Sequence, residues 1–179
     1  MTKDDLIGLV RQHALKFGDF ELKSGQRSNF YLDCRKITLL PAGLIYIVRH
    51  MQNLLDGVNF DAIGGPCVGA DPIVGAYLLA RALPQPELRG FLVRKEEKGH
   101  GLAGLVIGSV REGDRCVVVE DVTTTAGSLL KAADAVREAG CIPVMGVTLI
   151  DRSGGAAALA VKQNGMEFKS ILTLSDLGL

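Results

Sequence analysis

Two adjacent carboxylates, Glu120 and Asp121, stand between the apolar run CVVV and the hydroxyl-rich stretch TTTAGS. The segment that follows, SLLKAADAVREAG, has the apolar spacing of a helix. Unpaired N–H groups and the helix dipole at such a start attract phosphate. Carboxylates repel phosphate but accept hydrogen bonds from sugar hydroxyls. The order therefore predicts a ligand with a ribose between phosphates, its hydroxyls on the two acids and its terminal phosphate on the amides of residues 124–128.

A plainer interpretation of the same stretch is that Glu120-Asp121 caps a helix and that Thr123 to Thr125 form an ordinary turn. The loop matches neither GxxxxGKS nor GxGxxG, which argues against a nucleoside-triphosphate or dinucleotide site. The complete order of strand, paired acids, hydroxyl-rich loop and helix favours the phosphate and ribose site.

A second candidate is the charged segment VRKEEKGHG, residues 93–101, which leads into a glycine-rich stretch. Its basic side chains alternate with Glu96 and Glu97 and are Arg94, Lys95, Lys98 and His100. Donors of this kind that close over a leaving pyrophosphate would stabilise its charge and exclude water. The alternative is a solvated surface loop, which is what most charged runs are.

The elements that must position these residues alternate in type. Expected helices cover residues 3–16, 41–55, 72–83, 127–138 and 154–163, and expected strands cover 61–65, 90–93, 105–110, 117–120, 142–150 and 167–173. A hairpin or short antiparallel pair is expected around Ser24-Gly25. The alternation predicts an α/β fold with a mostly parallel central sheet flanked by helices. Ligands bind such sheets at the carboxyl ends of the strands, where residues 64–71, 94–100, 120–128 and 151–152 fall.

The bulk properties bound the function further. A chain of 179 residues fits one domain. Twenty basic and 20 acidic residues give a net charge of zero, which argues against a general nucleic-acid partner. The run CIPVMGVTLI is too short to span a membrane, and the start MTKDDLIGLV lacks the order of a signal peptide. Four cysteines without a CxxC pair suggest reduced thiols and a cytoplasmic protein.

The stretch VVVEDVTTTAGS resembles the phosphoribosyl-pyrophosphate motif of the type I phosphoribosyltransferases, in which a strand ends in two acids before a loop rich in Thr and Gly. The resemblance implies that fold, with a small N-terminal hood of about residues 1–40 plus the C-terminal strand over the base site. It also implies substrate contacts along the whole motif, at Glu120, Asp121, Val122, Thr123, Thr124, Thr125, Ala126, Gly127 and Ser128. Ala126 stands where many members carry Gly, and little harm is expected because it is small.

The pattern RKxxKxHG resembles the catalytic loop of the orotate phosphoribosyltransferases and is more specific than the phosphoribosyl-pyrophosphate motif alone. The resemblance implies contacts from Arg94, Lys95, Lys98 and His100 to the pyrophosphate end. Lys98, His100 and Asp121 are the implied catalytic residues. It also implies a homodimer in which part of this loop reaches the neighbouring subunit's site.

At the base end, FELKSGQRSNFYLD resembles the family's LKSGxxS stretch. The resemblance implies that Lys23, Thr124 and Arg152 contact orotate and that Tyr31 and Leu32 flank it. A plain hairpin with an exposed Lys23 is the alternative for the first segment. For Asp151-Arg152 the alternative is a surface ion pair worth ~0–1 kcal/mol.

The segment IGGPCVGADPI, residues 63–73, matches the position of the family's pyrophosphate loop but departs from it. Some members carry an aromatic residue followed by Lys where this chain has Val68-Gly69. A basic contact to the pyrophosphate is therefore missing or supplied from elsewhere. Asp71 is expected either to act through a metal-bound water or simply to cap the helix beside Pro72.

Together these resemblances imply an enzyme of pyrimidine synthesis that joins orotate to phosphoribosyl pyrophosphate, releasing orotidine 5′-phosphate and pyrophosphate. Mg²⁺ is implied as a cofactor that arrives with phosphoribosyl pyrophosphate, with no metal site built from protein ligands. Two alternatives remain at this stage. One is a phosphoribosyltransferase for another base, and the other is a regulator that only senses phosphoribosyl pyrophosphate.

Overall fold

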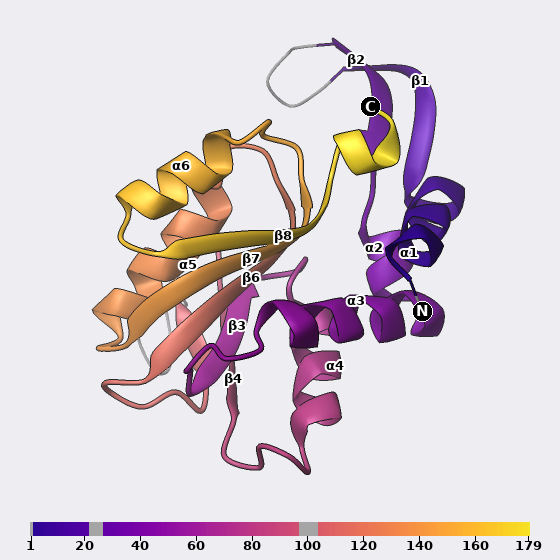
Figure 1. Cartoon of the computed structure of the whole chain (residues 1–179). Helices are drawn as coiled ribbons and strands as arrows, with labels where there is room; N and C mark the ends of the chain where they lie inside the picture. The colour runs from indigo at the N-terminus through magenta and orange to yellow at the C-terminus, as the bar shows by residue number, and fades with distance from the viewer. Residues whose placement is uncertain (1, 22–26, 97–103) are drawn as a thin grey trace.

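A six-stranded sheet forms the centre of the part of the chain that the computed structural model describes, residues 2–21, 27–96 and 104–179 (Figure 1). The strand order is β5-β4-β3-β6-β7-β8. Its strands are β3 Ala62–Pro66, β4 Arg89–Val93, β5 Val106–Gly108, β6 Arg115–Thr123, β7 Ile142–Asp151 and β8 Glu167–Thr173. Only the edge strand β5 pairs antiparallel within this sheet, so the expected mostly parallel α/β sheet is confirmed.

Helices cover both faces of this sheet, as Figure 1 shows. On one side lie α3 Pro41–Leu54 and α4 Asp71–Arg81, and on the other α5 Gly127–Glu138 and α6 Ala156–Gln163. The helices expected over 41–55, 72–83, 127–138 and 154–163 are thus confirmed to within two residues at each end. Pro41 sits in the first turn of α3, where its missing N–H costs nothing.

The central strand β6 shows why two cores form. Val117 and Val119 pack into one apolar cluster with α3 and α4, whereas Val118 packs into the other with α5 and α6. Successive side chains of a strand point to opposite faces, so an unbroken apolar run is what a strand covered on both sides requires.

The N-terminal segment folds as a separate small layer beside the sheet. Helix α1 Lys3–Leu9 begins at Thr2, which forms a capping box with Asp5. It continues as a π-helix over Val10–Ala14, so the helix expected to residue 16 ends two residues early. The expected antiparallel pair is confirmed as β1 Leu15–Glu21 and β2 Arg27–Leu32, and the short helix α2 Arg35–Thr38 follows it.

The C-terminal strand is not part of this layer, which corrects the expectation that it belongs to the hood. β8 pairs in parallel with β7 and closes one edge of the central sheet. The chain then turns through a 3₁₀ helix at Ser175–Leu177, which lies beside the N-terminal elements in Figure 1. Lys3 Nζ lies 2.9 Å from Asp176 Oδ1, and Arg11 Nη2 donates to the Leu177 carbonyl at 3.0 Å. The final turn thus bonds to the N-terminal layer.

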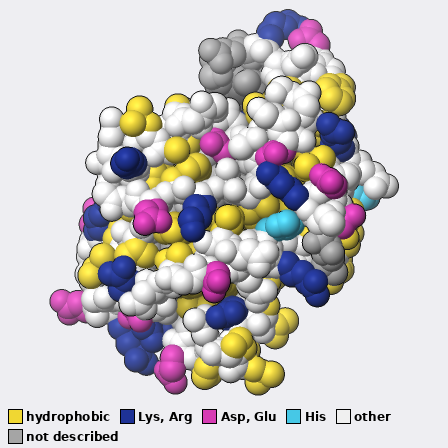
Figure 2. Space-filling model, viewed as in Figure 1, with side chains coloured by type: hydrophobic (Ala, Val, Ile, Leu, Met, Phe, Trp, Pro, Cys, Tyr) yellow, Lys and Arg dark blue, Asp and Glu magenta, His cyan; other side chains and the backbone are white. Residues whose placement is uncertain are grey.

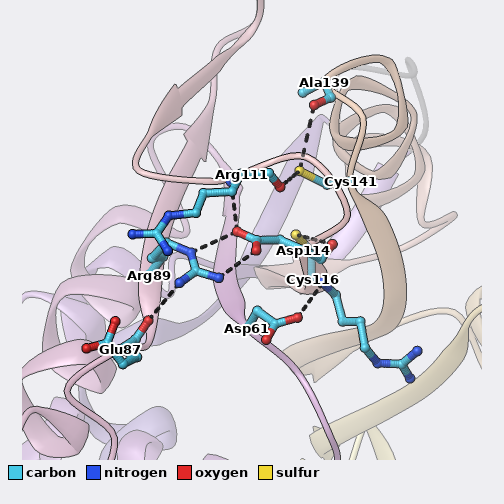
Figure 3. A network of polar contacts seen from close by, with 9 residues as sticks. Asp61, Glu87, Arg89, Arg111, Asp114, Cys116, Ala139 and Cys141 are labelled. Carbon is cyan, nitrogen blue, oxygen red and sulfur yellow. Dashed lines mark hydrogen bonds and ion pairs between the residues drawn. The ribbon is translucent and has the colours of Figure 1, made fainter.

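A polar network ties the beginnings of three strands together, at the end of the sheet opposite to the strand ends where ligands are expected (Figure 3). Asp114, just before β6, accepts from Arg89 Nε at 2.8 Å and from the Arg111 N–H at 2.8 Å. Asp61, just before β3, accepts from the Arg115 N–H at 2.9 Å. These bonds hold β3, β4 and β6 in place and leave the other end of the sheet free for a site.

The charged side chains on the surface reflect the equal numbers of basic and acidic residues in the sequence. Figure 2 shows Lys and Arg side chains mixed with Asp and Glu over the visible face. Within the described residues, no helix is long and apolar enough to cross a membrane.

Candidate active site

The two acids lie inside β6, because the strand runs three residues past Glu120 to Thr123. The expected strand end at residue 120 is therefore wrong. Parallel pairing with β7 continues to the same level, with Glu120 opposite Thr148 and Thr123 opposite Asp151. Alternation along the strand points Glu120 and Asp121 to opposite faces of the sheet.

A cradle of about 250 Å³ follows the strand. It is lined by Glu120, Val122, Thr123, Thr124, Thr125, Ala126, Gly127, Ser128 and Lys131. Ala126 takes a left-handed conformation with φ 60° immediately before α5, which explains why glycine suits this position in related motifs. Among the residues that the structure describes, no side chain caps the start of α5, and Asp121 Oδ1 instead accepts from the Val122 N–H at 2.9 Å. The alternative in which the acids cap the helix is therefore wrong, and the first N–H groups of α5 are open to a ligand.

A larger cavity of about 720 Å³ adjoins the cradle and shares Glu120, Ser128 and Lys131 with it. Its other lining residues include Arg94 and Lys95 from the end of β4, Asp121, and the turn 66–69 after β3. Gly69 packs so closely on the Asp121 carboxylate that a side chain there would collide with it. Cations and carboxylates thus face one space at the carboxyl ends of three neighbouring strands.

Burial perturbs both acids. Glu120 is 8% exposed, and burial, reinforced by the neighbouring Asp121 charge, raises its pKa from an ordinary 4.5 to about 7. Burial is also the main cause that raises the pKa of Asp121. Two buried acids with raised pKa values in one cavity are typical of a functional site.

Arg152 lies directly after β7, the strand that pairs with β6. Its N–H donates to the Thr123 carbonyl at 2.8 Å, and its guanidinium lies 4.8 Å from the centre of the Phe30 ring. Arg152 Nε is buried without a hydrogen-bond partner among the described residues. Asp151 accepts from the Ser153 N–H at 2.7 Å. No ion pair joins Asp151 to Arg152 within the described chain, so the simple surface pair is not what forms here.

The hairpin supplies a residue that sequence reasoning missed. Phe30 faces Arg152, whereas Tyr31 is 42% exposed and pairs with Phe20, their ring centres 5.6 Å apart. Leu32, expected beside the base, is instead buried in the core. NFYL carries two adjacent aromatic residues, and neighbouring side chains of a strand point to opposite faces, but the sequence alone does not say which one points inward.

Most of the predicted residues that the structure describes come together. Arg94, Lys95, Glu120, Asp121 and the loop 122–128 line the two adjoining cavities, and Arg152 follows the neighbouring strand. Lys23, Lys98 and His100 lie outside the described residues. Arg35 and Lys131 line the cavities although no sequence pattern singled them out.

Asp71 is the first residue of α4 rather than its cap, which is Ala70. Its Oδ1 is buried and has no hydrogen-bond partner in the described part of the chain. The simple capping role considered for Asp71 is therefore wrong.

The described residues contain no group of three or more His, Cys, Asp or Glu side chains that could hold a metal ion. Glu120 and Asp121 line the larger cavity, as do Asp134 and Glu138 of α5, and Glu120 also lines the cradle with the loop 122–128. This donor set matches the way Mg²⁺ is often bound, through one or two carboxylates together with substrate phosphates.

Comparison with known proteins agrees with this arrangement. Residues 38–164 match the family model described as the phosphoribosyl transferase domain. The orotate phosphoribosyltransferase of Rhodopirellula baltica is 43% identical over 97% of this chain and 93% of its own length. That of Mycobacterium avium is 40% identical over 98% and 96%. The relatives therefore match the N-terminal layer as well as the sheet.

Solved structures give the same result. The structure of Mycobacterium tuberculosis orotate phosphoribosyltransferase in complex with Fe(III) dicitrate has a TM-score of 0.87 and 37% identity and covers 99% of both chains. The same enzyme in complex with 5-phospho-alpha-D-ribosyl 1-diphosphate has a TM-score of 0.83 and 34% identity, again over 99% of both chains. The fold is thus that of a known group of enzymes.

Proposed function

This chain belongs to the orotate phosphoribosyltransferases of the phosphoribosyltransferase family, and we propose that it transfers the 5-phosphoribosyl group from phosphoribosyl pyrophosphate to orotate. The products are orotidine 5′-phosphate and pyrophosphate, a step of pyrimidine nucleotide synthesis. One substrate class is supported by the related enzyme solved with 5-phospho-alpha-D-ribosyl 1-diphosphate.

The 5′-phosphate is proposed to bind the cradle at residues 122–128. The open N–H groups at the start of α5 and the left-handed turn at Ala126 support this, because they direct several donors into one small space. Lys131, one turn into the helix, adds a positive charge at the rim.

Glu120 and Asp121 are proposed to accept hydrogen bonds from the ribose hydroxyls. Their positions support this, since Glu120 lines both cavities and Asp121 lines the larger one. A ribose bound between them bridges the cradle and the larger cavity. Asp121 would also stabilise the positive charge that develops on the anomeric carbon as pyrophosphate departs.

Orotate is proposed to bind at Arg152, with Thr124 and Lys23 as further contacts. The observation that carries this assignment is the buried Arg152 Nε, which has no partner among the described residues while its guanidinium lies over Phe30. A buried unpartnered donor is costly, so a planar anionic ligand that accepts from this fork gains more than usual. Phe30 offers a flat apolar surface beside it.

The loop containing Arg94, Lys95, Lys98 and His100 is proposed to bind the departing pyrophosphate. Arg94 and Lys95 already line the larger cavity. Lys98 and His100 are assigned by the family motif. We propose, by the same family likeness, that the enzyme is a homodimer whose loops serve neighbouring sites.

Mg²⁺ is proposed to enter bound to phosphoribosyl pyrophosphate. The two carboxylates at the cavity fit a cation that keeps most of its ligands from substrate and water. When bound, it would neutralise charge on the pyrophosphate. We also propose a cytoplasmic location, since all four cysteines are free thiols.

The orotate assignment is tested by replacing Arg152 with Gln. We expect the KM for orotate to rise about 10- to 100-fold, because a charge-assisted bond to the ligand is lost, while phosphoribosyl pyrophosphate binds as before. Lys162→Gln, an exposed cation on α6, serves as the control. An unchanged KM for orotate would contradict the assignment. Steady-state kinetics and calorimetry give the two readouts.

A further inference from the structure

Arg35 is an unassigned cation in the larger cavity. It is the first residue of α2, immediately after the N-terminal hairpin, and it lines the cavity together with Pro66, Cys67, Val68 and Gly69. Those four residues form the turn after β3 and carry no charged side chain. The N-terminal layer therefore places a positive charge beside residues 66–69, which have no charged side chain.

Asp33 holds the Arg35 side chain in place. Arg35 Nε donates to Asp33 Oδ1 at 2.7 Å, and Nη2 donates to Oδ2 at 3.1 Å. A guanidinium has five N–H donors, so this two-point contact leaves three of them free. The side chain is 57% exposed, and those donors are accessible from the cavity.

Arg35 lines the same cavity as Asp121, the acid assigned to the ribose. Burial raises the pKa of Asp121, and the Arg35 charge is near enough to oppose that rise. The adjacent Cys34 is buried, and the charges of Asp121 and Arg152 both act on it.

We propose that Arg35 binds the pyrophosphate group of phosphoribosyl pyrophosphate and supplies the basic contact that the turn at Val68-Gly69 lacks. This inference rests on the proposed function of the site. Arg35 approaches from the side of the turn 66–69, and Arg94 and Lys95 approach from the end of β4. Two groups of cations from separate elements would therefore enclose one polyanion, which a guanidinium can contact through two parallel donors.

The test compares Arg35→Ala, Arg35→Lys and Lys36→Ala. Lys36 is the matched control, because it is the next residue of α2, is exposed, carries the same charge and does not line the cavity. Calorimetry with Mg²⁺ measures the affinity of each protein for pyrophosphate, phosphoribosyl pyrophosphate and ribose 5-phosphate. Thermal unfolding of each variant checks that the fold is intact.

We expect Arg35→Ala to bind pyrophosphate and phosphoribosyl pyrophosphate about 10- to 100-fold more weakly, the usual loss for a charge-assisted contact. Ribose 5-phosphate, which lacks the pyrophosphate, should bind as in the wild type. Arg35→Lys should recover part of the loss, because it keeps the charge but not the fork. Lys36→Ala should match the wild type.

Two outcomes would overturn the inference alone. One is Arg35→Ala with wild-type affinity for pyrophosphate, and the other is an equal loss for ribose 5-phosphate, which would indicate a general structural effect. A wild-type protein that bound pyrophosphate through Arg35 but did not consume orotate would support this inference and refute the orotate assignment. A wild-type protein that bound neither pyrophosphate nor phosphoribosyl pyrophosphate would overturn both.

Discussion

Glu120 lowers the stability of the folded protein because its charge is buried, and the same burial prepares it to accept a hydrogen bond from a ligand. Its pKa of about 7 reflects burial of the carboxylate beside the charge of Asp121. A ligand hydroxyl that donates to the ionised form lowers this pKa on binding. The substrate therefore recovers part of the free energy that the folded protein loses by burying the charge.

The stability of the free protein should show this cost. Because the folded pKa of Glu120 is raised above its ordinary 4.5, the cost is absent below pH 4.5, grows as the pH rises, and is complete above about pH 7. Glu120→Gln should thus be more stable than the wild type at pH 8, by at most ~3 kcal/mol, and equally stable at pH 4. Urea unfolding at both pH values measures this difference.

The control for this experiment is Glu112→Gln, which replaces an exposed acid in the turn before β6. It should show no such dependence on pH. If the stability difference between Glu120→Gln and the wild type were the same at pH 4 and pH 8, the pKa of Glu120 would not be raised in the folded protein.

Among the elements, the regular ones could be predicted and the irregular ones could not. The apolar runs and helix signals located α3, α5 and β7 closely, because both their periodicity and their end signals are local. β6 was expected to end at Glu120 because charge normally ends a buried strand, yet its pairing with β7 carries it on to Thr123. The π-helix at Val10–Ala14 and the four-residue α2 depend on tertiary packing and leave no periodic signal.

The same division applies to the site. The acids, the cradle and Arg152 could be predicted because they belong to contiguous motifs at strand ends. Phe30 and Arg35 could not, because only the folding of the hairpin and α2 over the sheet brings Phe30 to Arg152 and Arg35 to the larger cavity. The spacing of residues along the chain does not predict contacts between the N-terminal layer and the central sheet.

At the opposite end of the sheet, the Arg89–Asp114 pair should act on stability alone. The two side chains are 15% and 7% exposed, and the hydrogen bond from Arg89 is the main cause that lowers the pKa of Asp114. Its stabilisation is therefore present above the ordinary pKa of an aspartate and is lost as the pH falls through the lowered value. Asp114→Asn should cost about 2–4 kcal/mol at pH 7, because Arg89 stays buried without its counter-charge.

Urea unfolding checks this figure, with Asp134→Asn as the control. That residue forms an exposed i,i+3 pair with Arg137, which is worth no more than ~1 kcal/mol. Equal losses in the two variants would show that the buried network does not hold the strand starts together. The KM for orotate should be unchanged in Asp114→Asn, since the network is remote from the cavities.

For the whole molecule, the sheet gathers the acids and cations at one end, and the N-terminal layer adds Phe30 and Arg35 from the side. The proposed homodimer adds the loop of a second subunit. If each site combines the acids of one subunit with the loop of the other, inactive subunits that lack different parts of the site should complement one another.

We expect equal amounts of Lys98→Ala and Asp121→Asn subunits, unfolded and refolded together, to recover about a quarter of the wild-type activity. Random pairing makes half of the dimers mixed, and one of the two sites in each mixed dimer is then intact. The variants refolded separately and assayed alone are the control. No recovery in a mixture that contains mixed dimers would mean that each site uses its own loop.

The most direct test of the central claim is the reaction itself. Purified protein is mixed with Mg²⁺, phosphoribosyl pyrophosphate and orotate, and the ultraviolet absorbance of orotate is followed. The account predicts a fall in absorbance that requires all three components and reverses when pyrophosphate is added. No change in absorbance, in a protein that binds phosphoribosyl pyrophosphate by calorimetry, would contradict the assignment of orotate as the base.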